Sequence, residues 1–232
     1  MIYNNMEKAL FLSRPNRFIA NCRLTNGQEV ICHVKNTGRC KELLIPEKSI
    51  VFLQKSDNEK RKTKYDLISV CKENRLINMD SQAPNQIVEE ALLNKKIILD
   101  GYDKITYFKR EKSFENSRFD IYLENGEKKA FAEIKGCTLE QNGIVMFPDA
   151  PTERGIKHIN ELIKVKKSGY DAFIIFAVQM KDVKYFTPNY KTHKEFGEAL
   201  KTAQKNGVTV LAFDCNVKYN SLEIRNPVKI LL

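Results

Sequence analysis

The chain has 232 residues, 42% of them hydrophobic and 29% charged, and no apolar run approaches the ~20 residues that cross a bilayer. This composition is typical of a soluble protein of one large or two small domains, and it excludes a membrane-spanning protein. The formal net charge of +10 favours a polyanionic partner, because lysine and arginine contacts to phosphate release counterions.

Residues 1–10 carry no basic segment followed by a long apolar core, so no secretory signal is predicted and a cytoplasmic location is expected. The cysteines show neither a CxxC pair nor a two-plus-two metal spacing. The nearest approach to a zinc site combines Cys32 and His33 with Cys22 and Cys40, without the tightly paired ligands that such sites use. We therefore expect reduced thiols.

Short, partly alternating runs predict β-structure in the first third of the chain. The predicted strands are 17–24, 28–35, 49–54 and 64–72. Asn26-Gly27 is a typical tight turn between the first two. Short strands without a long helical pattern indicate a small barrel or sandwich. A five-stranded oligonucleotide-binding (OB) barrel is the candidate that agrees with the positive charge.

The polar, proline-containing segment 76–86 interrupts this pattern and predicts a boundary between domains 1–83 and 84–232. Residues 85–96 then show a helical stripe, with Asn85 available as the cap. Further strands are predicted at 104–110, 118–123, 128–135, 144–147, 173–180 and 208–214, and helices at 152–167 and near 193–205. The second domain is thus predicted to be α/β, with a mixed sheet flanked by helices.

Two carboxylates and a lysine are predicted to meet in this second domain. Strand alternation places Glu133 and Lys135 on one face of the strand 128–135. The loop 124–127 makes this strand an antiparallel neighbour of the strand that carries Asp120. Asp120 and Glu133 can therefore lie side by side, with Lys135 one step along the same face.

Adjacent carboxylates repel each other unless a cation lies between them, and a hard divalent ion such as Mg²⁺ or Mn²⁺ takes oxygen ligands of this kind. Such an ion acidifies a water beside a phosphate, and Lys135 would place that water or neutralise charge growing on the phosphate. The alternative interpretation is a solvent-exposed hairpin face that carries cross-strand ion pairs.

The longest distinctive stretch of the sequence is FPDAPTERGIKHINEL at 147–162. Others are RFIANCRLTNG at 17–27, His33 with NTGR at 36–39, the Arg-Lys pair within 56–67, SRFD at 117–120 and EIKGCTL at 133–139. On these stretches the chain resembles the sugar fermentation stimulation protein family (SfsA) over nearly its whole length. It departs from the family where HVKNTG replaces HCPNTG and where Cys40 replaces a common methionine, which argues against a functional role for the cysteines.

The resemblance implies an N-terminal OB barrel followed by a restriction-endonuclease-like domain of the PD-(D/E)xK type, in proteins described as DNA-binding. Asp120, Glu133 and Lys135 fall on the D…E-x-K pattern. Glu90 falls on the position of the helix-borne acid that completes the metal site in the family. The helical stripe alone does not decide between Glu89 and Glu90 for this role. The implied catalytic residues are Asp120, Glu133, Lys135 and Glu90, and the implied ligands of Mg²⁺ or Mn²⁺ are Asp120, Glu133 and Glu90.

Arg154 and His158 lie four residues apart on one face of the predicted helix. They could direct a cation and a base at a phosphate, or cap a loop or pair with Glu161. The basic residues of the barrel have two interpretations. They could form a nucleic-acid-binding strip, with Tyr65 or Phe52 for base stacking, or they could be an ordinary solvated charged face. The residues expected to bind nucleic acid are Arg39, Lys41, Arg61, Lys62, Arg118, Arg154 and His158.

The sequence therefore predicts a DNA-binding protein with a metal-dependent, phosphodiester-hydrolysing centre. The alternative is a non-catalytic DNA-binding regulator of sugar-metabolism genes that retains the nuclease fold. An enzyme for a small phosphorylated sugar is disfavoured, because no glycine-rich phosphate loop is present. DNA is the favoured partner and RNA the second candidate, no membrane partner is expected, and a homo-oligomer is left open.

Overall fold

The computed structural model describes residues 1–36, 38 and 40–232. Their contacts divide the chain into two compact units. Unit 1 comprises 1–83, 179–181 and 215–223, and unit 2 comprises 84–178, 182–214 and 224–232. None of the helices in the described part of the chain has the length and apolar character of a bilayer-spanning segment.

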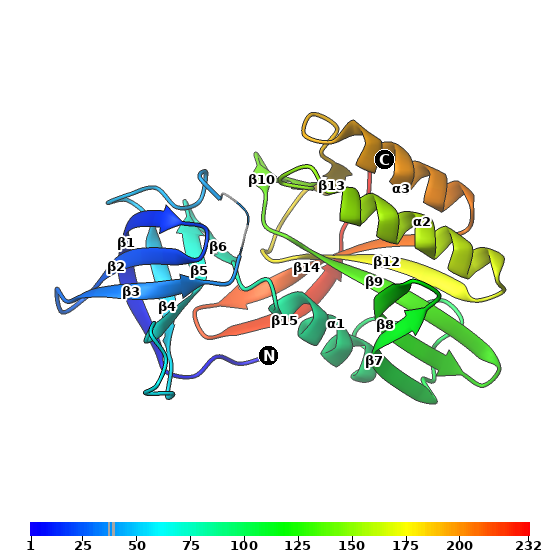
Figure 1. The fold of residues 1–232 in the computed structure, drawn as a ribbon, viewed down its shortest axis with the longest axis horizontal. Coiled ribbons are helices and arrows are strands. Elements are labelled where there is room, and N and C mark those ends of the chain that lie inside the picture. The colour runs from blue at the N-terminus through cyan, green and yellow to red at the C-terminus, as the bar shows by residue number, and fades with distance from the viewer. Residues whose placement is uncertain (37, 39) are drawn as a thin grey trace. The chain divides into compact units, whose positions relative to one another are not determined.

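Unit 1 contains a closed barrel, whose strands run from blue to cyan in Figure 1. Its strands are β1 (Met6–Asn16), β2 (Ile19–Leu24), β3 (Glu29–Val34), β4 (Ile50–Lys55) and β5 (Tyr65–Lys72). β1 pairs antiparallel with β2 and β4, β2 with β3, and β4 with β5. Parallel pairing of β3 with β5 closes the barrel. This confirms the predicted OB-type barrel over the sandwich.

Alternation along β2 and β3 fills the barrel core. Ala20 and Cys22 on β2, and Cys32 and Val34 on β3, are each 0% exposed. Gly27, in the turn between these strands, has a φ of +88°, a conformation that glycine adopts without steric cost. The predicted Asn-Gly turn therefore lies where the hairpin needs it.

Within the barrel sheet, the described strands β1 and β6 (Arg75–Asn78) were not predicted. The register of β1 shifts between Phe11 and Ser13, and this irregularity hides its alternation in the sequence. β6 pairs with β5 inside the segment 76–86, which was expected to be a polar break between the domains. That expectation is wrong for residues 76–78, which are strand, and α1 begins at Ala83, two residues before the predicted helical stripe 85–96.

Unit 2 is built on a mixed sheet with the strand order β15-β14-β12-β9-β8-β7. These strands are β7 (Tyr107–Phe114), β8 (Ser117–Asn125), β9 (Lys128–Cys137), β12 (Asp171–Val178), β14 (Thr209–Lys218) and β15 (Ser221–Pro227). β12 is parallel to β9 and β14, whereas β7, β8 and β9 are antiparallel to one another. A smaller sheet joins β10 (Glu140–Gln141), β11 (Ile144–Phe147) and β13 (Tyr185–Pro188). The mixed α/β sheet was predicted.

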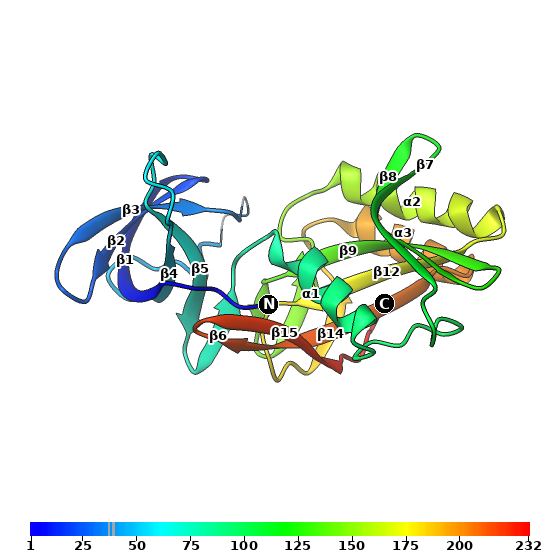
Figure 2. The same cartoon turned by 90° about the horizontal axis from the view of Figure 1, so that it is seen from below.

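The helices of unit 2 are α1 (Ala83–Leu93), α2 (Glu153–Lys167) and α3 (Lys194–Lys205) among the described residues. α2 and α3 pack side by side in both views (Figures 1 and 2), and α2 also contacts β12 and β9. Thr152 caps α2 as predicted, because its Oγ1 accepts a hydrogen bond from Gly155 N at 3.0 Å. The cap fixes where α2 begins, five residues before His158.

Candidate active site

The hairpin of β8 and β9 carries the predicted carboxylates. Its pairing runs from Asn125–Lys128 to Ile121–Ala132, which confirms the predicted antiparallel hairpin. One residue beyond this pairing, Oδ2 of Asp120 accepts a hydrogen bond from the backbone N of Ile134 at 2.8 Å. The carboxylate thus satisfies a backbone donor where the ladder between the two strands ends.

The other oxygen of Asp120 is held from α1. Oδ1 accepts a hydrogen bond from Nδ2 of Asn85 at 2.9 Å. The prediction that Asn85 caps this helix is wrong, because α1 begins at Ala83 and Asn85 lies in its first turn. Its role in the site was missed, because nothing in the local sequence distinguishes a cap from a donor to a distant strand.

Burial, together with the neighbouring charge of Glu133, raises the pKa of Asp120. Hydrogen bonds from Ile134 and Asn85, and the charge of Lys135, oppose only part of this rise. The register that pairs Ile121 with Ala132 places Asp120 and Glu133 at neighbouring positions of the two strands. A cation between them would remove the repulsion between the two carboxylates.

Glu133 is almost completely buried, at 3% exposed, which excludes the alternative of a solvent-exposed face at this position. Its Oε1 lies 2.5 Å from Nζ of Lys135 and 2.5 Å from Nδ1 of His158. Burial alone would raise the pKa of Glu133, but His158 and Lys135 outweigh burial and lower the pKa. Glu133 is therefore ionised at neutral pH.

The second oxygen of Glu133, Oε2, is buried and has no hydrogen-bond partner among the described residues. A buried carboxylate oxygen without a donor is costly, and a cation would supply the missing partner. With Asp120 next to it, the donor set consists of carboxylate oxygens, which suit a hard divalent ion. The residues present therefore fit such an ion.

His158 reaches the site from α2. Its side chain is 12% exposed, and Nε2 of His158 accepts a hydrogen bond from Nε of Arg154 at 3.4 Å. Glu161, the alternative partner considered from sequence, instead forms an ion pair with Lys164 at 2.7 Å. Arg154 is exposed to solvent. A chain of hydrogen bonds therefore joins the surface residue Arg154, through His158, to the buried Glu133.

The two acids of α1 have different surroundings. Glu89 forms an ion pair with Arg110, and Oε1 of Glu90 accepts a hydrogen bond from Nε2 of Gln86 at 2.9 Å. Across the described ranges, no three His, Cys, Asp or Glu side chains converge as a ready-made metal-binding group. The role of Glu90 as a third ligand accordingly stays a prediction.

The predicted nucleic-acid contacts are spread over both units. On the barrel, Lys41 and Lys62 are exposed, whereas Arg61 is bound to Asp66 through Nη1 at 3.1 Å and Nη2 at 2.5 Å. In unit 2, Arg118 is exposed, with Glu111 3.4 Å from its Nη1. Arg39 lies outside the described residues.

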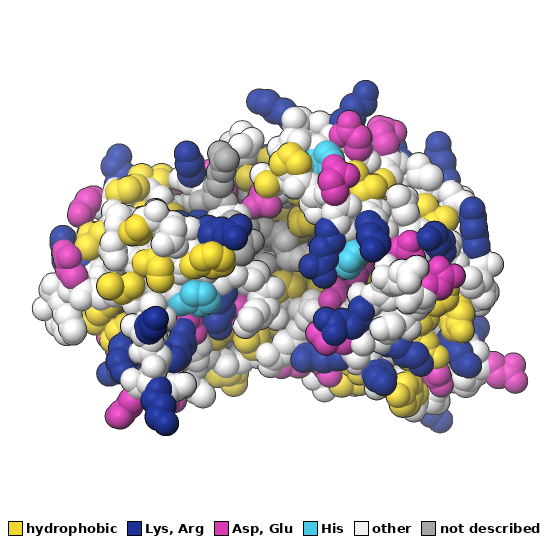
Figure 3. All heavy atoms as spheres, viewed as in Figure 1, with side chains coloured by type: hydrophobic (Ala, Val, Ile, Leu, Met, Phe, Trp, Pro, Cys, Tyr) yellow, Lys and Arg dark blue, Asp and Glu magenta, His cyan; other side chains and the backbone are white. Residues whose placement is uncertain are grey.

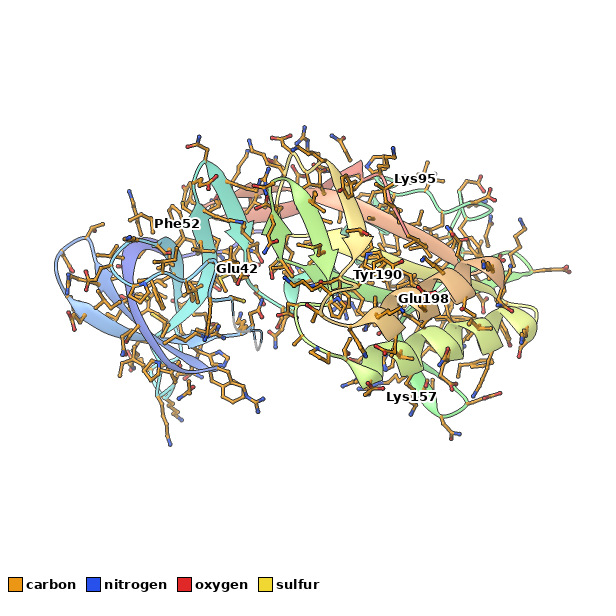
Figure 4. All side chains as sticks on the ribbon, turned by 90° about the horizontal axis from the view of Figure 1, so that it is seen from above. Glu42, Phe52, Lys95, Lys157, Tyr190 and Glu198 are labelled. Atoms are coloured by element: carbon orange, nitrogen blue, oxygen red, sulfur yellow. The ribbon has the colours of Figure 1, made fainter. Side chains whose placement is uncertain are left out.

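The two stacking residues predicted on the barrel differ in exposure. Tyr65 is 7% exposed, and its hydroxyl donates to Glu7 Oε1 at 3.1 Å, so a stacking role for Tyr65 is wrong. Phe52, labelled in Figure 4, is half-buried, and its ring centroid lies 6.2 Å from that of Tyr219.

The profile described as "SfsA N-terminal OB domain" matches residues 12–79, and the profile described as "Sugar fermentation stimulation protein RE domain" matches residues 82–221. Two relatives, both named sugar fermentation stimulation protein homolog, are similar over the whole chain. The one from Clostridium beijerinckii is 56% identical over 100% of both chains. The one from Desulfitobacterium hafniense strain DCB-2 is 54% identical over 100% of this chain and 99% of its own.

A solved structure, that of Pyrococcus furiosus SfsA in complex with Ca²⁺, matches with a TM-score of 0.88 and 26% identity. The match covers 100% of this chain and 98% of the other. The sequence profiles, the relatives and the solved structure all indicate the same family along both units. The chain therefore belongs to the sugar fermentation stimulation protein family.

Proposed function

We propose that the chain is a divalent-metal-dependent phosphodiester hydrolase that acts on nucleic acid, DNA in the first place. The observation that carries this proposal is the buried Glu133 Oε2, which lacks a hydrogen-bond partner in the described part of the chain and belongs to the residue next to Asp120 across the β8–β9 hairpin. The net charge of +10 suits a polyanionic substrate. The related Pyrococcus furiosus protein, described in complex with Ca²⁺, supports binding of a divalent ion here.

Asp120 and Glu133 would hold Mg²⁺ or Mn²⁺, with Glu90 as the further ligand. When bound, such an ion lowers the pKa of a water so that hydroxide is available near neutral pH. Lys135, 2.5 Å from Glu133 Oε1, places a positive charge beside the carboxylates, where negative charge on a phosphate would grow.

Two side chains and one backbone amide hold the carboxylates in place. Asn85 fixes Oδ1 of Asp120, and the amide of Ile134 fixes Oδ2. His158 fixes Oε1 of Glu133 from the α2 side. Two carboxylates whose positions are fixed in advance lose little conformational freedom when an ion binds.

The test is a cleavage assay on single-stranded, duplex and branched DNA and on RNA, with Mg²⁺, Mn²⁺, Ca²⁺ or EDTA. Asp120→Asn and Lys135→Ala should each lower cleavage by about a hundredfold or more while nucleic acid is still bound. Lys157→Ala is the matched control, because Lys157 is exposed on α2 (Figure 4). Unchanged cleavage in both site variants would overturn the proposed centre.

A second candidate is a DNA-binding regulator without turnover. It is favoured by the contacts of Glu133 Oε1, because Lys135 and His158 already compensate this carboxylate without an ion. Binding of DNA with no product under any of the metals would support the regulator and exclude the hydrolase.

A further inference from the structure

A pocket of about 120 Å³ lies where α1 ends and the chain continues toward β7. All of its lining residues fall between positions 92 and 105, so the pocket belongs to unit 2 alone. Two of them are apolar and well exposed, Ile98 at 63% and Leu93 at 52%. The apolar walls are formed by Leu92, Leu93, Ile97, Ile98, Tyr102 and Ile105. The fold thus leaves aliphatic side chains in contact with solvent around a small hollow.

The wall from α1 is fixed by the way in which this helix ends. After the last helical residue, Leu93, the N of Lys95 donates to Leu92 O at 3.2 Å and the N of Lys96 to Ala91 O at 2.8 Å. This pair of hydrogen bonds usually requires glycine at the position of Lys95. The lysine has a φ of +57°, which is strained for a residue with a side chain. A lysine that occupies a glycine position and lines a pocket indicates a use for its charge.

The opposite wall is held by hydrogen bonds from other elements. The hydroxyl of Tyr102 donates to Oδ2 of Asp171 at 2.9 Å. Nδ2 of Asn125 donates to Gly101 O at 2.9 Å and to Oδ1 of Asp103 at 3.2 Å. The pocket is therefore formed in advance, which lowers the entropic cost of binding an occupant.

The charged side chains that line the pocket favour an anionic occupant. Lys95, labelled in Figure 4, and Lys104 are exposed, whereas the acidic Asp103 is engaged by Asn125. Figure 3 shows lysine and arginine side chains spread over the visible faces of both units, so positive charge alone does not single out this pocket. Its distinguishing feature is the combination of lysines with aliphatic walls.

This combination fits a peptide better than a nucleic acid. Tyr102, the aromatic residue of the walls, is 3% exposed, so a base finds no ring to stack on here. Phosphate groups would use the lysines and leave the apolar walls in water. A peptide with an apolar residue between acidic ones would use both.

We propose that this hollow, named here the α1 pocket, binds an acidic peptide segment of a partner protein, with one leucine-sized side chain inserted. A cavity of about 150 Å³ with apolar walls accepts benzene. The α1 pocket, at about 120 Å³, has room for one branched aliphatic side chain. Carboxylates on either side of that residue would pair with Lys95 and Lys104. This binding would require neither a metal ion nor hydrolysis.

The probe is the fluorescein-labelled peptide Glu-Asp-Glu-Leu-Glu-Asp, titrated with the whole chain at low salt in EDTA and followed by anisotropy. Alanine in place of the leucine should weaken binding by about tenfold or more, because the buried apolar side chain is lost. Glutamine and asparagine in place of the acids should weaken binding by about fivefold, because two exposed ion pairs are lost. Equal affinities for the three peptides, or no binding at millimolar concentration, would overturn the inference.

Variants of the chain locate the binding. Ile98→Ala should weaken binding of the leucine peptide by about fivefold. Ile31→Ala is its control, because Ile31 is 56% exposed in unit 1, and it should change the affinity by less than about twofold. An unchanged affinity in Ile98→Ala would place the peptide elsewhere and refute the α1 pocket.

Lys95→Gly separates binding from folding. It should weaken binding by about threefold, because one ion pair is lost, and raise the thermal unfolding temperature, because glycine relieves the strained backbone. A loss of binding in a more stable variant cannot come from unfolding. Lys157→Ala removes one exposed charge on α2 and should leave the affinity unchanged.

Two other occupants would show themselves in the same experiments. Displacement of the labelled peptide by a single-stranded oligonucleotide would assign the α1 pocket to nucleic acid. Self-association of the wild type that Ile98→Ala abolishes, measured by analytical ultracentrifugation, would assign it to a second copy of the chain. Either result would overturn the proposal of a peptide partner.

Discussion

Nδ2 of Asn85 on α1 donates a hydrogen bond to Oδ1 of Asp120 on β8 at 2.9 Å, across 35 positions of sequence. Both oxygens of this carboxylate are thus engaged, one by a helix and one by the neighbouring strand. An amide that orients a proposed metal ligand acts on the affinity for the ion as well as on the fold.

Asn85→Ala should weaken binding of Ca²⁺ or Mn²⁺ by about tenfold, because outer contacts of this kind hold a ligand in its binding orientation. Isothermal titration calorimetry measures the effect. Asn160→Ala is the control, since Asn160 is exposed on α2. An unchanged affinity in Asn85→Ala would show that this hydrogen bond is only structural.

Loss of His158 should destabilise the fold through Glu133. His158→Ala leaves the buried Oε1 with Lys135 alone, so the free energy of unfolding should fall by about 2 kcal/mol in urea titrations near neutral pH. Arg154→Ala removes an exposed residue whose guanidinium donates to the outer nitrogen of this imidazole, and should cost less than about 0.5 kcal/mol. Equal costs for the two variants would contradict this account.

The lowered pKa of Glu133 predicts a loss of stability in acid. The folded-state pKa lies below the ordinary value of 4.5, so the contribution is fully present above that value. It is lost as the pH falls through the folded-state pKa. The contribution of Asp120 to the free energy of unfolding has the opposite sign. Its raised pKa makes ionisation in the folded state costly, and that cost is relieved as the pH falls.

Glu133→Gln isolates the first of these contributions. The difference in unfolding free energy between wild type and Glu133→Gln should shrink between about pH 7 and about pH 3.5, as the carboxylate is protonated. Urea titrations at both pH values provide the measurement. A difference that stays constant would mean that the ionised form of Glu133 has no special stabilisation.

Divalent ions should stabilise the chain by mass action. At a hundredfold excess over the dissociation constant, Ca²⁺ or Mn²⁺ should add about 2.7 kcal/mol to the free energy of unfolding. Thermal unfolding with the ion or with EDTA measures this gain. Asp120→Asn should abolish it, because the amide that replaces the carboxylate is uncharged. An equal gain in the variant would place the ion elsewhere.

Patterns local in sequence were enough to predict much of this molecule. Alternation gave the barrel strands, and the placement of Glu133 and Lys135 on one face followed from their spacing alone. Tyr65 was assigned wrongly because residues 65–70 of β5 are all buried, so this strand has no alternation from which to choose a face.

Contacts between distant segments could not be predicted. The helical pattern placed His158 and Arg154 on one face of α2, but it could not show that this face meets Glu133, 25 residues away. For the same reason Arg61 was expected to contact phosphate, and its bidentate contact with Asp66 became visible only when the loop before β5 was placed against that strand.

Asp120 ends the ladder between β8 and β9 with a side-chain oxygen, and the proposed ion would draw on the same carboxylate. Occupancy of the centre and protection of one backbone proton are therefore coupled. The amide of Ile134 becomes an internal reporter, whose proton chemical shift and exchange rate should respond to every ion that enters or leaves, in the absence of any nucleic acid.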